Sequence, residues 1–377
     1  MGDCSSEHDA EVKRSKLVVI LGPTATGKTD ASIQVALKLK EHNIDAEIIN
    51  ADSMQVYKGF HIGTAKPTLQ QMNQVKHHLF DFIDPSEEYN AASYVNDCSK
   101  TIEKLHSHGS LPILVGGTNM YVEGLLWPSV IDMQPNDPDE PKETYEGSNA
   151  APLFHYAAEY TTKQLYKMLK AQDPERATVL HPNDRKRITR SLNIIKTHGK
   201  KHSELIETRR EFRKKIGSKY DALIFTMQCD PGAHKGLIKR RTRKMFEQGI
   251  IDECLQLMRM IERGEAAGLS KGICQSIAYK EIIPILGESL EKESSPSSNT
   301  INRCVAALET ATWKYVRRQN TWIQNRLKDE SGVKVVHLDT TDFGFRDAKE
   351  FLYKAATRAC LTALLIHCKV IIDIVVY

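Results

Sequence analysis

Residues 17–29 read LVVILGPTATGKT, and this segment is the strongest indication of fold class in the chain. Its first five residues are apolar, as in a buried strand, and the next eight match the pattern G-x-x-x-x-G-K-[ST] in full. The residues that follow have the apolar spacing of a helix. A strand, a glycine-rich turn and a helix in this order indicate a phosphate cradle, in which backbone N–H groups and a lysine face an anion. The predicted phosphate-binding residues are Gly22, Pro23, Thr24, Ala25, Thr26, Gly27, Lys28 and Thr29.

Further apolar runs alternate with longer stretches that are compatible with helices. This alternation is typical of α/β proteins, so we expect a P-loop-type parallel sheet flanked by helices, with a helical insertion subdomain. The predicted strands are residues 17–21, 47–50, 111–115, 223–227 and 333–338.

The insertion is predicted from two neighbouring segments. Residues 128–151 are rich in Pro, Asp, Glu, Asn and Gly and lack periodicity, whereas residues 161–208 have helical periodicity and become increasingly basic. The predicted organisation is a disordered N-terminus (1–16), the first part of the catalytic core (17–127), the mainly helical insertion (128–212), the second part of the core (213–340) and a C-terminal tail (341–377).

Composition is that of an ordinary globular protein. The 377 residues carry a net charge of +4, which permits a polyanionic partner without requiring one. The eight cysteines are scattered, so we expect neither a zinc site nor a disulfide framework. We expect a monomer in the cytosol, with the mitochondrion as a second compartment. We expect no stable membrane association, because the apolar run at 361–377 is shorter than the ~20 residues of a membrane span.

Two strand ends carry information about chemistry. Kinases and NTPases usually place a Mg²⁺-binding carboxylate at the end of a second core strand, but the run at 111–115 ends in Gly116-Gly117-Thr118. The run at 47–50 is followed by Asp52, at the edge of the sheet where ligands bind in such folds. By itself, Asp52 is compatible with a helix N-cap, an indirect Mg²⁺ ligand or a catalytic base.

Seven segments between residues 22 and 326 read GPTATGKT, DSMQVYKGFHIGTAKPT, HHLFDFIDPSEEYNAASY, LVGGTNMYVEGLLW, DPERATVLHPNDRKRITR, QSIAYKE and WKYVRRQNTWIQNR. In this order they resemble the tRNA dimethylallyltransferase family, and the resemblance covers about residues 17–326. The resemblance implies transfer of the dimethylallyl group from dimethylallyl diphosphate to the N6 amine of the adenine 3′ to the anticodon, with release of diphosphate. The implied partners are the tRNA anticodon stem-loop and dimethylallyl diphosphate, and the implied cofactor is Mg²⁺.

The resemblance also implies roles for individual residues. Asp52 accepts a proton from the adenine amine, and a general base of this kind typically contributes ~10²–10⁴ in rate. Thr24 lies near the reacting centre, and Thr118 lies near the nucleic acid. The phosphate cradle holds the diphosphate, with the Thr29 hydroxyl on Mg²⁺ and Lys28 stabilising the charge of the leaving group.

Arg241 is a further catalytic candidate. It shares a predicted helix face with the apolar Ile238 and Met245, and an inward guanidinium requires an anion. That anion is either the diphosphate or a buried carboxylate. Leu237, one turn earlier, departs from the family, whose members usually carry Arg at that place.

Basic clusters point to RNA. The first lies at 185–190, and the second combines Arg317 and Arg318 with neighbouring aromatic residues, the combination on which single-stranded loops stack. Each cluster alone also fits a solvated helix face. We expect no C-terminal zinc finger of the eukaryotic type. The predicted tRNA-contacting residues are Asp52, Ser53, Met54, Gln55, Thr118, Lys186, Arg187, Ile188, Thr189, Arg190, Gln275, Tyr279 and Lys280.

Three alternatives compete with this interpretation. An adenylate dimethylallyltransferase of the cytokinin type would use AMP, ADP or ATP as acceptor, but the basic insertion favours a macromolecule. A phosphoryl-transferring kinase is disfavoured by the missing acid at the strand end. A catalytically weakened tRNA-binding relative is left open by Leu237.

Overall fold

The computed structural model describes residues 14–127, 160–269, 271–290, 295–327 and 333–341. The predicted loop at 128–151, most of the predicted disordered N-terminus and the C-terminal tail after residue 341 lie outside the described residues. Of the described residues, those before 127 and after 217 form one compact unit, and those from 127 to 217 form a second. The sequence-based boundaries of the insertion are 128–212.

A six-stranded parallel sheet forms the centre of the first unit, in the order β3-β2-β4-β1-β5-β6. This confirms the predicted fold class. The short β3 was not predicted, because two half-buried histidines have no recognisable pattern. The strands are β1 (Lys16–Leu21), β2 (Ala46–Ala51), β3 (His77–His78), β4 (Leu111–Gly116), β5 (Asp221–Gln228) and β6 (Lys334–Asp339).

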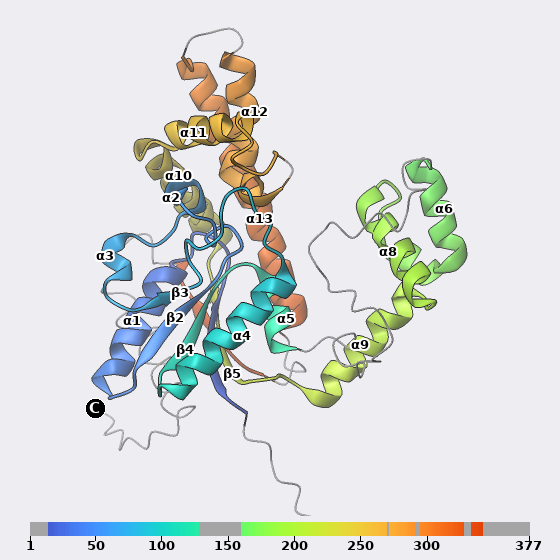
Figure 1. The fold of residues 1–377 in the computed structure, drawn as a ribbon, viewed down its shortest axis with the longest axis horizontal. Helices are drawn as coiled ribbons and strands as arrows, with labels where there is room; N and C mark the ends of the chain where they lie inside the picture. The colour runs from blue at the N-terminus through green and yellow to red at the C-terminus, as the bar shows by residue number, and fades with distance from the viewer. Residues whose placement is uncertain (1–13, 128–159, 270, 291–294, 328–332, 342–377) are drawn as a thin grey trace, which may run out of the picture. The chain divides into compact units, whose positions relative to one another are not determined.

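Helices cover the sheet and extend beyond it (Figure 1). Helix α1 buries Ile33 and Leu39 against Val18 and Phe225 of the strands. Figure 1 shows α11 and α12 beyond the end of the sheet to which the strands point, with α13 running back along it. The helices are α1 (Lys28–Glu41), α2 (His61–Thr64), α3 (Leu69–Met72), α4 (Ala91–Ser107), α5 (Asn119–Leu126), α10 (Pro231–Glu247), α11 (Ile250–Glu262), α12 (Ile277–Leu290) and α13 (Ser298–Arg326), with a 3₁₀ turn at Gly272–Gln275.

A second apolar core joins α11, α12 and α13 to the segment after β2. Tyr57, Phe60, Tyr279 and Leu308 are all buried in it. Because this core lies next to the carboxyl ends of the strands, it fixes the loop that follows Asp52. Among the helices that the structure describes, none combines the length and apolarity that a membrane crossing requires.

The second unit is helical. Its core contains Leu165, Leu169, Ile188 and Leu192. The buried carboxylate of Asp173 accepts hydrogen bonds from the backbone N–H of Arg176 and from the backbone and hydroxyl of Ser203, which ties two of its helices together. Its helices are α6 (Thr162–Gln172), α7 (Pro174–Val179), α8 (Arg185–His198) and α9 (His202–Ile216).

Candidate functional site

The glycine-rich loop connects β1 to α1 and curls around one carbonyl group. The Thr26 hydroxyl and the Lys28 ammonium both donate to the Pro23 carbonyl, over 2.8 and 2.7 Å. Gly27 begins α1 with φ of 84°, in the left-handed region. A Cβ at Gly22 would lie 2.9 Å from Cβ of Met227 on β5, so the close approach of the two segments requires glycine there.

Three charged side chains from separate elements meet at this loop. Burial and, to a smaller extent, repulsion from Arg241 lower the pKa of Lys28 to about 7, against the opposing attraction of Asp52. Burial also lowers the pKa of Arg241, again against the attraction of Asp52. Asp52 follows β2 and Arg241 lies on α10, so the structure brings together three residues predicted independently. With two cations and one carboxylate, the cluster has excess positive charge for an anionic ligand.

Backbone hydrogen bonds fix the Asp52 segment. The Asp52 N–H donates to Oδ1 of the buried Asn50 over 2.9 Å, and Oδ1 of Asp52 accepts from the Met54 N–H over 2.9 Å. Next to it, the Ser53 N–H donates to the Thr118 hydroxyl over 2.9 Å. Asp52, Ser53, Met54 and Thr118 therefore lie together where β2 and β4 end.

The missing strand-end acid has a steric explanation. A Cβ at Gly116 would lie 2.1 Å from the carbonyl oxygen of Ala51, and a Cβ at Gly117 would lie 2.3 Å from Nε2 of Gln319. No side chain larger than hydrogen fits at either position without moving its neighbours. The carboxylate of this site is supplied by the end of β2 instead.

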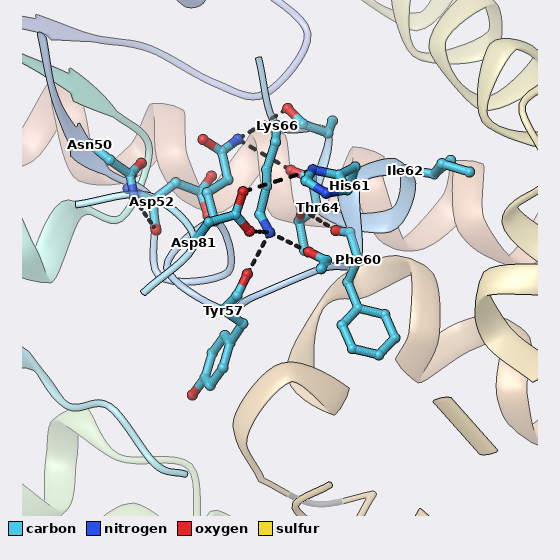
Figure 2. A network of polar contacts seen from close by, with 12 residues as sticks. Asn50, Asp52, Tyr57, Phe60, His61, Ile62, Thr64, Lys66 and Asp81 are labelled. Atoms are coloured by element: carbon cyan, nitrogen blue, oxygen red, sulfur yellow. Dashed lines mark hydrogen bonds and ion pairs between the residues drawn. The ribbon is translucent and has the colours of Figure 1, made fainter. Parts of the chain in front are cut away.

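A buried lysine organises the loop after Asp52, as Figure 2 shows. The Lys66 ammonium donates to the carbonyl groups of Tyr57 and Gly59 and forms an ion pair with Asp81. Burial lowers the pKa of Lys66, while Asp81 opposes that shift. Within this loop, Nε2 of Gln55 donates to the carbonyl groups of residues 64 and 65 over 3.2 and 3.1 Å. Sequence reasoning did not identify Lys66 or Asp81.

Helix α13 contributes groups that the sequence did not single out. Oε1 of Gln319 accepts from the Thr24 N–H over 3.0 Å, and Nε2 of Gln319 donates to the Gly117 carbonyl over 3.0 Å. From α10, Nε2 of His234 donates to the Thr24 carbonyl over 2.8 Å. Thr24 is thus held through both of its backbone polar groups.

The aromatic residues of α13 have partners of their own. The Tyr315 hydroxyl donates to the Gly117 carbonyl over 3.2 Å, and burial together with Asp52 raises the pKa of Tyr315. The Arg318 guanidinium lies over the Tyr315 ring at 5.7 Å. Nε1 of Trp322 donates to Glu123 over 3.3 Å. These contacts attach α13 to the end of β4 and to α5.

The comparisons with known proteins agree on one family. Residues 55–326 match the sequence model described as IPP transferase. The chain is 34% identical to the tRNA dimethylallyltransferase of Caldicellulosiruptor saccharolyticus over 83% of its own length and 90% of that protein. The chain belongs to the IPP transferase family. It is also 32% identical to the tRNA dimethylallyltransferase of Schizosaccharomyces pombe, over 82% of this chain and 68% of that one.

Solved structures of IPP transferases have the same fold. A structure of a eukaryotic dimethylallyltransferase acting on tRNA matches with a TM-score of 0.73 and 30% identity, over 95% of this chain and 81% of that one. The full-length tRNA isopentenylpyrophosphate transferase from Bacillus halodurans matches with a TM-score of 0.57 and 29% identity, over 94% and 99% of the two chains.

Two residues predicted to contact tRNA have buried side chains. Tyr279 has 0% exposure, and its hydroxyl donates over 2.8 Å to Glu253, which also accepts from the N–H groups of Ile62 and Gly63. Ile188, also at 0%, packs in the core of the second unit. Neither side chain is exposed at the surface, and the tRNA contacts of these two residues stay a prediction.

The other predicted tRNA residues lie at accessible positions. Gln275 is half-buried and its Nε2 donates to the Leu269 carbonyl over 3.0 Å, while Lys280 is exposed on α12. In the second unit Thr189 is half-buried, and three basic residues are exposed on α8, namely Lys186, Arg187 and Arg190. Arg187 pairs with Asp184, the N-cap of α8, at 3.4 Å.

Proposed function

We propose that this IPP transferase moves a dimethylallyl group from dimethylallyl diphosphate to the N6 amine of the adenine 3′ to the anticodon in tRNA, releasing diphosphate. The observation that carries the proposal is the meeting of Asp52 with Lys28 and Arg241 at the glycine-rich loop. In one displacement reaction, a carboxylate base acts on the attacking amine and two cations bind the leaving diphosphate. The relatives named tRNA dimethylallyltransferase support the same reaction.

The donor diphosphate binds in the loop. Backbone N–H groups at the start of α1, the Lys28 ammonium and the Arg241 guanidinium face its negative charge. The electrostatic interaction of these groups with the diphosphate becomes stronger as the leaving diphosphate accumulates charge in the transition state. Thr29, half-buried in the first turn of α1, is the residue that would hold Mg²⁺ through its hydroxyl, as in other loops of this pattern. When bound, Mg²⁺ would neutralise diphosphate charge.

The acceptor amine meets Asp52. As the adenine nitrogen forms its bond to the allylic carbon, the bond from that carbon to the diphosphate oxygen breaks and Asp52 takes the amine proton. The Met54 N–H holds one oxygen of Asp52, which orients the carboxylate for this transfer. Ser53, Gln55 and Thr118 surround the acceptor side. A loop base is the natural substrate, because extruding it costs less than opening a duplex.

The basic face of α8 binds the tRNA backbone. Its exposed cations Lys186, Arg187 and Arg190 have the reach and charge for phosphate contacts, which supply much of the affinity for nucleic acids. A free-nucleotide enzyme has no use for such a basic surface.

We also propose that the protein acts as a monomer, in the cytosol and in the mitochondrion.

An acceptor competition tests the proposal. Purified protein is incubated with dimethylallyl diphosphate labelled in the allyl group, Mg²⁺ and an equimolar mixture of unmodified tRNA, AMP and ADP. We expect the label in tRNA, and we expect Asp52→Asn to slow its appearance by roughly 10²-fold or more. Label in AMP or ADP would contradict the proposal in favour of a cytokinin-type enzyme, and absence of label from every acceptor would contradict transferase activity.

A further inference from the structure

One side chain connects the two halves of the site. Gln319, on α13, has an exposure of 3% and uses both ends of its amide. Its oxygen accepts from the Thr24 N–H, and its nitrogen donates to the Gly117 carbonyl, each over 3.0 Å. Thr24 belongs to the diphosphate cradle, and Gly117 precedes the residue that contacts Ser53 on the acceptor side.

The packing around Gln319 makes this bridge specific. Gly117 has no Cβ, and one placed there would lie 2.3 Å from Nε2 of Gln319, so the absence of a side chain creates the space for the amide. Tyr315, one turn earlier on α13, donates to the same carbonyl. An amide supplies one donor and one acceptor at a fixed separation, which neither an apolar side chain nor a carboxylate provides.

We propose that Gln319 is a positioning residue, which sets the separation between the bound dimethylallyl diphosphate and the acceptor amine. This inference rests on the proposed function. The connection runs from Thr24 through Gln319 to Gly117, continues to Thr118, whose hydroxyl accepts from the Ser53 N–H, and ends at the neighbouring Asp52. Displacing the donor from the base by about 1 Å can cost ~10²-fold in rate.

The expected effect falls on turnover rather than on binding. Gln319 bonds to the backbone of the cradle, whereas Lys28 and the N–H groups that begin α1 meet the diphosphate themselves. Loss of the bridge should therefore leave diphosphate affinity nearly unchanged. It should slow the step that needs the two substrates aligned.

The test compares Gln319→Leu, Gln319→Glu and a control, Gln324→Leu, whose position is exposed on the same helix. Transfer to tRNA is measured under saturating and limiting dimethylallyl diphosphate. We expect Gln319→Leu to lower kcat by ~10- to 100-fold with little change in KM for the diphosphate. The control should match wild type.

Gln319→Glu separates positioning from mere packing. A neutral carboxyl group can donate to Gly117 and accept from Thr24, as the amide does, whereas a carboxylate repels the Gly117 carbonyl. The ratio of variant to wild-type kcat should therefore rise as pH falls. The inference about Gln319 is overturned if this ratio does not change with pH, or if the Gln319→Leu enzyme has wild-type kcat. In either case an active wild type still upholds the proposed function. An inactive wild type contradicts both.

Discussion

The depressed pKa of Lys28 makes a quantitative prediction about diphosphate binding. In the free protein its ammonium group has a pKa of about 7, because burial and Arg241 disfavour the charged form. A bound diphosphate favours that form and raises the pKa, so binding takes up a proton above pH 7. Since about half of Lys28 is protonated at pH 7 and about 1% at pH 9, affinity for dimethylallyl diphosphate should fall by about 50-fold across this interval. The phosphate groups do not add to this trend, because they ionise near pH 6.

Calorimetric titration without tRNA measures this effect directly. Repeating the titration at each pH in buffers of different ionisation enthalpy, with Mg²⁺ constant, gives the number of protons taken up. We expect nearly one proton per diphosphate at pH 8 and much less at pH 6. Lys28→Arg is the matched variant, because its guanidinium stays protonated and its affinity should not decline between pH 7 and 9. A wild-type affinity that is constant over this range, with no proton uptake, would refute the assignment of Lys28 as the titrating contact.

Three further perturbations test other parts of the molecule. Asp52→Asn should lower kcat by roughly 10²-fold or more while the Kd for tRNA stays near wild type, because it removes a base and not a docking contact; equal turnover in single-turnover assays would remove Asp52 from the chemistry. Gly116→Ala should lower Tm, because its Cβ would lie 2.1 Å from the Ala51 carbonyl oxygen. The control Gly236→Ala should leave Tm unchanged, because a Cβ there would have no neighbour within 4 Å. A lower Tm for Gly236→Ala than for Gly116→Ala in thermal unfolding would contradict the close approach of Gly116 to Ala51. The third perturbation replaces four basic residues of the second unit with alanine, namely Arg185, Lys186, Arg187 and Arg190. It should weaken tRNA binding and reduce the slope of log affinity against log salt by roughly 0.7 to 0.9 per lost contact. An unchanged slope would identify these residues as a solvated helix face.

The main elements of the fold are predictable from sequence because buried parallel strands are continuous apolar runs. All five predicted strands occur, each within two residues of its expected bounds. The strand at 77–78 escapes prediction, since it consists of two histidines paired to Ile48 and Ile49 of the neighbouring strand. Its pairing depends on tertiary position and not on its own residue pattern.

Prediction of the site was limited by long-range contacts. Asp52 and Arg241 were located because position at a strand end or on a helix face is a local property, and the role of Asp52 was taken from the family resemblance. Gln319 and His234 contact Thr24 across 295 and 210 residues of sequence, and a buried polar residue in a helix has the same local pattern as an exposed one. Tyr279 shows a second limit: membership in a family motif does not indicate whether a side chain is exposed or, as here, buried and bonded to Glu253.

The most direct measurement concerns the product of the reaction. After incubation with dimethylallyl diphosphate and unmodified tRNA, the tRNA is digested to nucleosides and to anticodon-loop fragments and analysed by mass spectrometry. We predict that the adenosine 3′ to the anticodon gains one dimethylallyl group on N6, and that no other nucleoside changes. Unmodified tRNA, or a dimethylallyl group on a different nucleoside, would contradict the assignment of this site to N6 transfer at that adenine.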